Sequence, residues 1–383
     1  MGEFNYGDPL PLPLNRRSMR RQTDERAAKH FAKQLCEADA LYLRGADGVR
    51  EGLALLDLEA GNIRYWQAWA ADAFTAYPDD PLAAEICRDC ALRGILVTDL
   101  RLHPAEKIRW LEVAYQACLA LADRQGERKA LNQLGVAWAD LGEARKAIEF
   151  YEESLVIARE TGSRDGEKHT LSNLGNAWAA LGNYRMAIEY HQSHYAIARE
   201  IGDRRAEGNA LNNLGNASAS LRDFQEAVRF HSERLTIACE MGDRRAEGQT
   251  LNNLGNAWYL LGNTDKAIDF HTRRLVIALE TGDRRGEGSA RGNLGLVWAA
   301  RGEHEKALGC YDHHLLIAAD TGDSRAEANA RLNMALSLRS LGRVTEAISF
   351  ARTAFELFQA IESPLAEAAR LILNDLGPGP SPS

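Results

Sequence analysis

The chain has 383 residues, 45% hydrophobic and 26% charged, a composition typical of a folded protein rather than of a disordered one. Its 54 acidic and 46 basic residues give a net charge of −8, which argues against a general binder of nucleic acid or of anionic membranes. No apolar run approaches the roughly 20 residues that cross a bilayer and no signal-like apolar core begins the chain, so we expect a cytoplasmic location.

The N-terminal part differs from the rest. Residues 1–24 combine proline-rich and basic stretches without helical periodicity, so we expect a flexible leader. From Glu25 onward apolar residues recur at helical spacing, and a second helix-rich stretch at 48–74 carries Trp66 and Trp69. The segment YPDDP at 77–81 then breaks the pattern. Residues 25–82 are therefore predicted to form a helical cap.

A forty-residue phrase recurs over 123–363. It reads LNQLGVAWADLG at 131, LSNLGNAWAALG at 171, LNNLGNASASLR at 211 and LNNLGNAWYLLG at 251, and two further copies begin at 291 and 331. Because one unit cannot bury its own apolar side, neighbouring units are expected to stack into a solenoid. We expect a degenerate first repeat over 83–122, six repeats over 123–363, a capping helix over 364–376 and a flexible tail over 377–383.

Each repeat is predicted to contain two helices. In the unit 203–242 the pattern places them at about 204–221 and 225–240. Asp203 stands where an N-cap accepts backbone N–H groups, and Gly202 stands where the preceding helix ends in the left-handed region. Both residues recur forty positions later as Asp243 and Gly242, so the same boundaries are expected in the next repeat.

Glycine recurs inside the first helix of five repeats, where each glycine costs roughly 1 kcal/mol relative to alanine. We therefore expect a second helix to approach closely there. The tryptophans of the same helices are expected to pack in the core rather than to stack on a ligand. The two columns comprise Gly135, Gly175, Gly215, Gly255 and Gly295, and Trp138, Trp178, Trp258 and Trp298.

No cofactor, metal or catalytic group is expected. His191, which precedes His194 by three residues, shares its column with Tyr151, so a partly buried aromatic ring that hydrogen-bonds between repeats is favoured over a metal site. Cys87 and Cys90 form a lone C-x-x-C without a second pair at zinc-ribbon spacing. No nucleophile, acid or base recurs or converges, so we do not expect an enzyme.

The repeat motif resembles a known family. Leu134-Gly135, the aromatic residue at 138, Leu141-Gly142 and Ala147 match the tetratricopeptide repeat (TPR). The forty-residue period resembles that of Partner of Inscuteable type adaptors and of many bacterial regulators. The segment GVREGLALLDLEAGNIRYWQAWA at 48–70 is similar to segments of bacterial signal-transduction (STAND/NB-ARC) NTPases, but no Walker motif occurs. The resemblance implies an all-α, right-handed TPR superhelical solenoid with an N-terminal helical cap, acting as an adaptor, scaffold or sensor in signalling.

The family geometry directs the first helix of each repeat toward a concave groove. Side chains three or four positions apart share that face. The predicted peptide-binding residues are Arg205, Asn209, Asn212 and Asn216; Arg245, Gln249, Asn252, Asn256 and Tyr259; Arg285; and His169, Ser172 and Asn176. Carboxamides can donate to and accept from an extended backbone, and arginines pair with carboxylates, so we expect a protein or peptide ligand with acidic residues.

Other interpretations remain open at this stage. The asparagine column at 213, 253 and 293 is expected to bond between stacked helices, and Arg205 could pair locally with residues such as Glu207. The groove could also be occupied by a flanking segment of the same chain or by a second copy, as in a self-associating regulatory fragment. A nucleic-acid or small-molecule sensor using the same arginines is a third reading.

Overall fold

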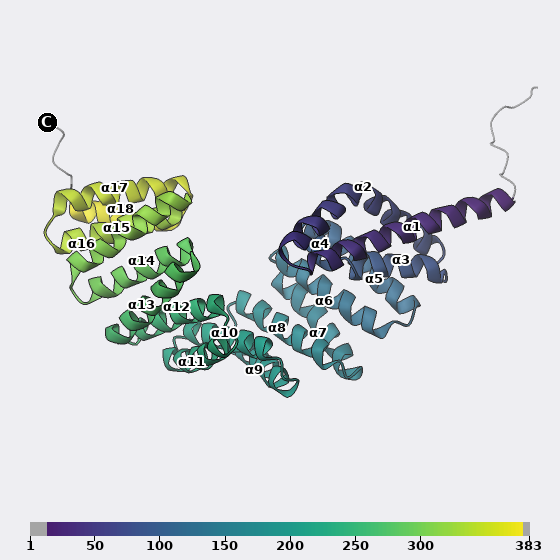
Figure 1. Ribbon diagram of the computed structural model, residues 1–383, viewed down its shortest axis with the longest axis horizontal. Helices are drawn as coiled ribbons and strands as arrows, with labels where there is room; N and C mark the ends of the chain where they lie inside the picture. Colours follow the sequence, from purple (N-terminus) through teal and green to yellow (C-terminus); the bar gives the residue numbers. More distant parts are fainter. Residues whose placement is uncertain (1–13, 378–383) are drawn as a thin grey trace, which may run out of the picture. The chain divides into compact units, whose positions relative to one another are not determined.

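Residues 14–377 are described by the computed structural model, and every regular element in this range is an α-helix (Figure 1). The helices form two compact units, with the boundary between Ile197 and Ala198 inside helix α9. Within each unit, most helices pack against the next one along the chain. The fold is therefore all-α and built from consecutive helix pairs.

The first unit contains the N-terminal helices and the earliest repeats. Its elements are α1 Leu14–Tyr42, α2 Ala46–Ala76, α3 Pro81–Leu92, α4 Ile95–Asp99, α5 Pro104–Ala120, α6 Arg124–Asp140, α7 Ala144–Glu160, α8 Arg164–Ala180 and α9 Tyr184–Glu200, the last of which contains the boundary. The segment expected to be a degenerate repeat thus holds α3 and α5 with the five-residue helix α4 between them.

Helix α1 begins at Leu14, well before the expected helix start at Glu25. The expectation relied on apolar periodicity, which the basic stretch 14–24 lacks. That stretch contains neither glycine nor proline and several arginines, which are good helix formers. Residues 1–13 of the predicted leader and 378–383 of the predicted tail lie outside the described residues.

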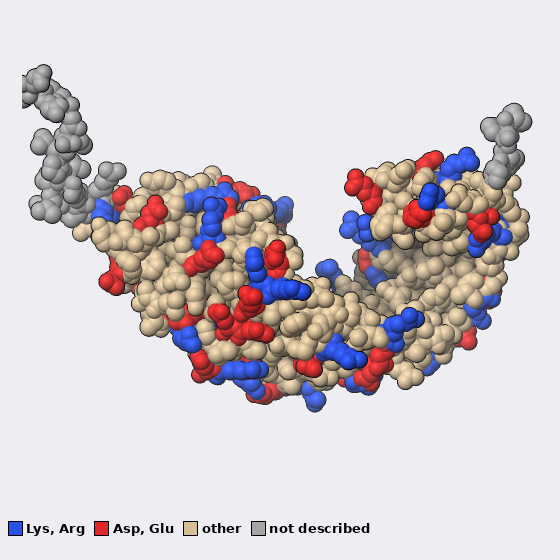
Figure 2. All heavy atoms as spheres, turned by 180° about the vertical axis from the view of Figure 1, so that it is seen from behind, with Lys and Arg blue, Asp and Glu red and all other residues tan. Residues whose placement is uncertain are grey.

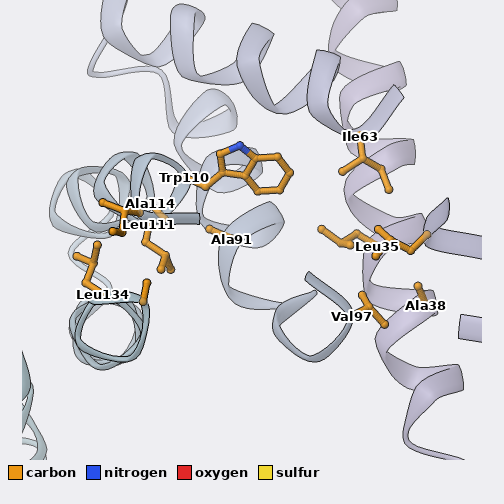
Figure 3. Packing of buried hydrophobic residues seen from close by; sticks show 12 residues of the cluster. Leu35, Ala38, Ile63, Ala91, Val97, Trp110, Leu111, Ala114 and Leu134 are labelled. Atoms are coloured by element: carbon orange, nitrogen blue, oxygen red, sulfur yellow. The ribbon is translucent and has the colours of Figure 1, made fainter. Parts of the chain in front are cut away.

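Helix α5 joins the N-terminal helices to the repeats. Its Trp110 and Leu111 are almost fully buried, as is Leu35 of α1. Figure 3 shows this cluster, to which α2, α3, α4 and α6 also contribute buried residues. Its labelled members are Leu35, Ala38, Ile63, Ala91, Val97, Trp110, Leu111, Ala114 and Leu134. Burial of these side chains makes α1–α5 one body with the start of the repeats.

The second unit contains the remaining repeats. Its helices are α10 Arg204–Ser220, α11 Phe224–Glu240, α12 Arg244–Leu260, α13 Thr264–Thr281, α14 Arg284–Ala300, α15 His304–Thr321, α16 Ser324–Ser340, α17 Val344–Ala360 and α18 Leu365–Leu376. The bounds of α10 and α11 lie within one residue of those predicted.

Capping residues fix these boundaries. Asp203 Oδ1 accepts the backbone N–H of Ala206 at 3.0 Å, and Asp243 Oδ1 accepts that of Ala246 at 2.9 Å. Gly282 ends α13 with φ 69°, in the left-handed region that glycine adopts at little cost. The first helices α10, α12 and α14 therefore begin at the same register, forty residues apart.

The glycine inside each first helix faces an aromatic ring of the second helix. A Cβ at Gly255 would lie 2.5 Å from Cε1 of His271, and one at Gly135 would lie 2.4 Å from Cε1 of Tyr151. Gly215 meets His231 in the same way. The predicted close approach is confirmed, because any larger residue would collide with a buried ring.

Candidate functional site

The predicted groove residues of the second unit lie on one side of α10, α12 and α14. Seven of them are exposed and three are half-buried. The exposed set, called the open row below, is Arg205, Asn209, Asn216, Arg245, Gln249, Asn256 and Arg285. The half-buried residues are Asn212, Asn252 and Tyr259.

The arginines of the open row have no carboxylate partner among residues 14–377. Arg205, Arg245 and Arg285 form no ion pair with any residue that the structure describes, although Arg245 contributes to the lowered pKa of Asp283 at longer range. Such guanidinium groups keep their hydrogen-bond donors available to a ligand.

The arginine one position earlier behaves differently. Arg204 Nη1 lies 2.6 Å from Glu207 Oε2, and Arg204 also pairs with Glu240. A step of about 100° around the helix separates it from Arg205, which turns the earlier arginine toward the next helix. Arg244 and Arg284 repeat the pattern with Glu247 and Glu287, each at 2.7 Å. The local pairing considered for the Arg205 column is therefore made by its neighbours.

Asparagines form hydrogen bonds between successive first helices. Asn253 Nδ2 donates to Asn212 Oδ1 at 3.4 Å and to Asn216 Oδ1 at 3.3 Å, and Asn293 Nδ2 donates to Asn252 Oδ1 at 2.9 Å. The predicted bonding of the 253 and 293 positions between stacked helices is confirmed. The side-chain oxygens of three predicted groove residues are consequently already engaged.

Three carboxamides of the open row are not part of this ladder. Within residues 14–377, the side chains of Asn209, Gln249 and Asn256 make no hydrogen bond. Their donors and acceptors face solvent in the repeats that also carry Arg205 and Arg245.

Three predicted groove residues belong to α8 in the first unit. His169 and Asn176 are exposed, whereas Ser172 is half-buried. His169 lies beside Asp165, with 3.8 Å between Nε2 and Oδ1. The three residues stand forty positions before Asn209, Asn212 and Asn216, but Asp165 replaces the arginine of the open row, which is formed within the second unit.

The histidine column is part of the packing. His271 is 1% exposed, and burial lowers its pKa to about 4. His231 is equally buried and its pKa is lowered to about 4 for the same reason, with a smaller effect of Arg234. These imidazoles are therefore neutral at pH 7. The predicted aromatic packing is confirmed, but the rings are fully rather than partly buried and Nδ1 of His231 and of His271 has no hydrogen-bond partner among the described residues.

The tryptophans are half-buried rather than fully enclosed. Trp258 lies under Lys266, whose Nζ is 3.7 Å from the ring centroid, and Trp298 lies under Lys306 at 4.4 Å. Trp298 also packs against an apolar cluster of α15, α16 and α17, and in both repeats a lysine covers part of the ring. The tryptophan rings therefore serve packing rather than stacking on a ligand.

Sequence reasoning missed two arginines of the second helices. Arg234 and Arg274 are 7% and 9% exposed, and a pocket opens beside Arg274 between α12, α13 and α14. A signal existed: both arginines occupy a column that holds Ser154 and Ala354 in other repeats, and they pack near Gly208 and Gly248. An arginine that faces a glycine of the neighbouring helix indicates that its guanidinium group lies between the packed helices.

Other chemistry finds little support among the described residues. No group of three histidine, cysteine, aspartate or glutamate side chains in that part of the chain could hold a metal ion. Burial raises the pKa of Cys87 to about 12, which keeps its thiol protonated. Figure 2 shows lysines and arginines interspersed with aspartates and glutamates on the face that it presents.

Over residues 14–377, no helix combines the length and the apolar character that a membrane span requires.

Comparison with known families decides the identity of the repeats. Models of the tetratricopeptide repeat match residues 126–200, 169–240, 250–285 and 286–360, more than half of the chain. The chain belongs to the tetratricopeptide-repeat family. The resemblance inferred from the LG and aromatic positions is confirmed, and the matched TPR segments include the open row except Arg245 and Gln249. No curated protein matches the sequence.

Solved structures share this TPR fold at low sequence identity. A STAND protein with a tetratricopeptide repeat sensor from Pyrococcus horikoshii is 18% identical with a TM-score of 0.59, over 80% of this chain and 49% of that one. BtubC from P. vanneervenii is 24% identical with a TM-score of 0.52, over 58% of this chain and 93% of that one. A Rap protein complexed with Competence and Sporulation Factor is 15% identical with a TM-score of 0.51, over 91% and 97%.

Proposed function

We propose that the open row binds an extended acidic segment of another protein, so that the chain serves as a noncatalytic scaffold or sensor. The main support is that consecutive arginines differ in whether they form ion pairs. Arg204, Arg244 and Arg284 are consumed by internal ion pairs, whereas the exposed Arg205, Arg245 and Arg285 meet no carboxylate within the described residues. The acidic partner of the second column is then supplied by the ligand.

The carboxamides suit the backbone of such a segment. Asn209, Gln249 and Asn256 each present a donor and an acceptor at the surface, which can serve the N–H and C=O groups of an extended chain. Because these groups recognise backbone, they add affinity without selecting a sequence, and selection falls to the arginines. Asn216 and Asn252 keep their N–H donors for the same purpose but share their oxygens with the asparagine ladder, whereas Asn212 also donates from Nδ2 to Asn213 Oδ1 at 3.4 Å.

Structural neighbours support an interaction role in general terms. The Rap protein with this fold was solved in complex with Competence and Sporulation Factor, and the repeat part of the Pyrococcus protein is described as a sensor. The mixture of positive and negative side chains in Figure 2 and the net charge of −8 favour a protein ligand over nucleic acid.

A peptide-binding measurement tests this function. Fluorescence anisotropy would compare a labelled extended peptide carrying glutamates with the same peptide carrying glutamines. We expect binding of the glutamate peptide only, and a loss of about tenfold or more in the Arg205→Ala/Arg245→Ala/Arg285→Ala variant, because each desolvated pair contributes roughly 1–3 kcal/mol.

The matched control is Arg204→Ala/Arg284→Ala, to be compared with Arg205→Ala/Arg285→Ala, because it removes the same number of positive charges from the adjacent column. Its affinity for the glutamate peptide should stay close to that of the wild type. Equal losses in the two double variants would show that net charge alone drives binding and would overturn the assignment to the open row.

A further inference from the structure

A pocket of about 500 Å³ opens between α12, α13 and α14. Its polar lining comprises chiefly Arg244, Arg245, Gln249, Arg274, Asp283 and Arg285. Pockets of roughly 300–1,000 Å³ are of the size that holds small ligands, so a whole side chain of a bound segment can enter this one.

The lining is strongly cationic. Arg244 pairs with Glu247 at 2.7 Å and also with Glu280, so its charge is largely balanced. Three guanidinium groups, those of Arg245, Arg274 and Arg285, then stand against the single carboxylate of Asp283, which leaves two positive charges. A group with about two negative charges would balance them.

The equivalent pocket one repeat earlier is nearly closed. It lies beside Arg234, is lined by Arg204, Arg205 and Asp243, and measures about 30 Å³. Arg234 is turned into the stack, where its Nε donates to Thr250 Oγ1 at 2.7 Å and its Nη1 donates to the carbonyl oxygen of Gly208 at 2.9 Å.

Two sequence differences explain why Arg274 lies elsewhere. Ala290 replaces the threonine that accepts from Arg234, so the corresponding inward bond cannot form. Gly286 replaces Ala246, and a Cβ at this position would lie 1.7 Å from Arg274 Nη2. The guanidinium therefore passes over Gly286 and pairs with Asp283 at 2.5 Å, its only hydrogen-bond acceptor among the described residues.

We propose that this pocket is an anchor site for a dianionic oxyanion group, either a phosphoryl group or two neighbouring carboxylates. The proposal deepens the function proposed above, because Arg245, Gln249 and Arg285 belong to both the pocket and the open row. Arg274, held in place by packing, offers its remaining donors from the floor of the pocket, and Arg245 and Arg285 close on the anion from the rim.

The test converts one pocket into the other without changing any charge. Gly286→Ala/Ala290→Thr gives the repeat of Arg274 the residues that accompany Arg234. Isothermal titration calorimetry with inorganic phosphate, and separately with succinate, would be run against chloride at matched ionic strength. We expect the wild type to bind at least one of the two anions, and the variant to bind it at least tenfold more weakly.

The reciprocal variant Ala246→Gly/Thr250→Ala is the matched control. It should release Arg234 toward Asp243 and add a second anion site, so that the stoichiometry rises. Asp283→Asn, which keeps an N-cap residue, should tighten anion binding because it removes the competing carboxylate.

Each outcome has a defined meaning. Binding of phosphate alone identifies a phosphoryl group, binding of succinate alone identifies paired carboxylates, and binding of both supports recognition by charge. The proposal is overturned if the wild type binds neither anion, or if Gly286→Ala/Ala290→Thr and Asp283→Asn both bind as the wild type does. Anion binding without glutamate-peptide binding would refute the proposed function alone, and the reverse result would refute the anchor site alone.

Discussion

Arg204 and Arg205 are neighbours in the chain, yet they lie in two different regions of helix α10. Both side chains are exposed, but Arg204 pairs with Glu207 of its own helix and with Glu240 of α11, whereas Arg205 is in the open row and meets no carboxylate among the described residues. Asparagines divide in the same way, since Asn253 donates to Asn212 in the first helix of the preceding repeat and Asn256 faces solvent. Residue type alone therefore does not identify a binding residue; its angular position on the helix does.

The buried histidines should make the free energy of unfolding sensitive to acid, whereas the open row should not. His271 has a pKa of about 4 in the folded state and an ordinary value of 6.5, so the unfolded chain binds the proton first as pH falls. Stability should be constant above pH 6.5 and should decrease between pH 6.5 and 4, by about 3 kcal/mol for this histidine. Urea unfolding at pH 7 and pH 4.5 measures the difference.

Tyrosine provides the control for that experiment. His271→Tyr places on Gly255 the ring that Tyr311 places on Gly295, without a group that titrates in this window. The variant should lose less stability than the wild type between the two pH values. An identical loss would show that the acid sensitivity arises elsewhere.

The next largest effect compares alanine substitutions at two neighbouring positions of α12, one that faces the second helix and one in the open row. Gly255→Ala forces a Cβ against His271, so we expect a loss of about 2 kcal/mol even though alanine favours the helix. Asn256→Ala, one position further on in the open row, should change stability by less than about 0.5 kcal/mol. Chemical unfolding of both variants decides the matter, and similar losses would contradict the division into packed and open sides.

The smallest expected effect concerns the arginine pair. Glu207 is 6% exposed, so Arg204→Ala leaves a buried carboxylate with less compensation and should cost about 1 kcal/mol of stability. Arg205→Ala should cost almost nothing in stability and should instead weaken binding of the glutamate peptide. Thermal unfolding and fluorescence anisotropy on the same two proteins measure the two effects. A larger stability loss in Arg205→Ala together with a larger affinity loss in Arg204→Ala would contradict the comparison.

Much of the fold could be predicted because its signals are local and periodic. Asp203 and Gly202 mark helix ends, and Gly255 with its counterparts marks close approach, so the bounds of α10 and α11 were correct to one residue. The start of α1 was missed because a basic stretch without apolar periodicity is nevertheless helical.

The candidate site could be predicted only in part. The open row follows from helical spacing, but the engagement of Asn216 by Asn253 depends on the offset between neighbouring helices. The pocket beside Arg274 depends on three residues of two helices, Arg274 of α13 and Gly286 and Ala290 of α14. Their combined effect appears only when the two helices are packed together. Such coupling has no signature in a single window of sequence.

The most direct measurement is a structure of the protein with a bound glutamate-rich peptide. We expect the peptide to lie along α10, α12 and α14, with a carboxylate on Arg245 or Arg285 and its backbone on Gln249 and Asn256. A peptide bound on the second helices α11, α13 and α15, with Arg205, Arg245 and Arg285 left uncovered, would contradict the assignment of the open row as the binding surface.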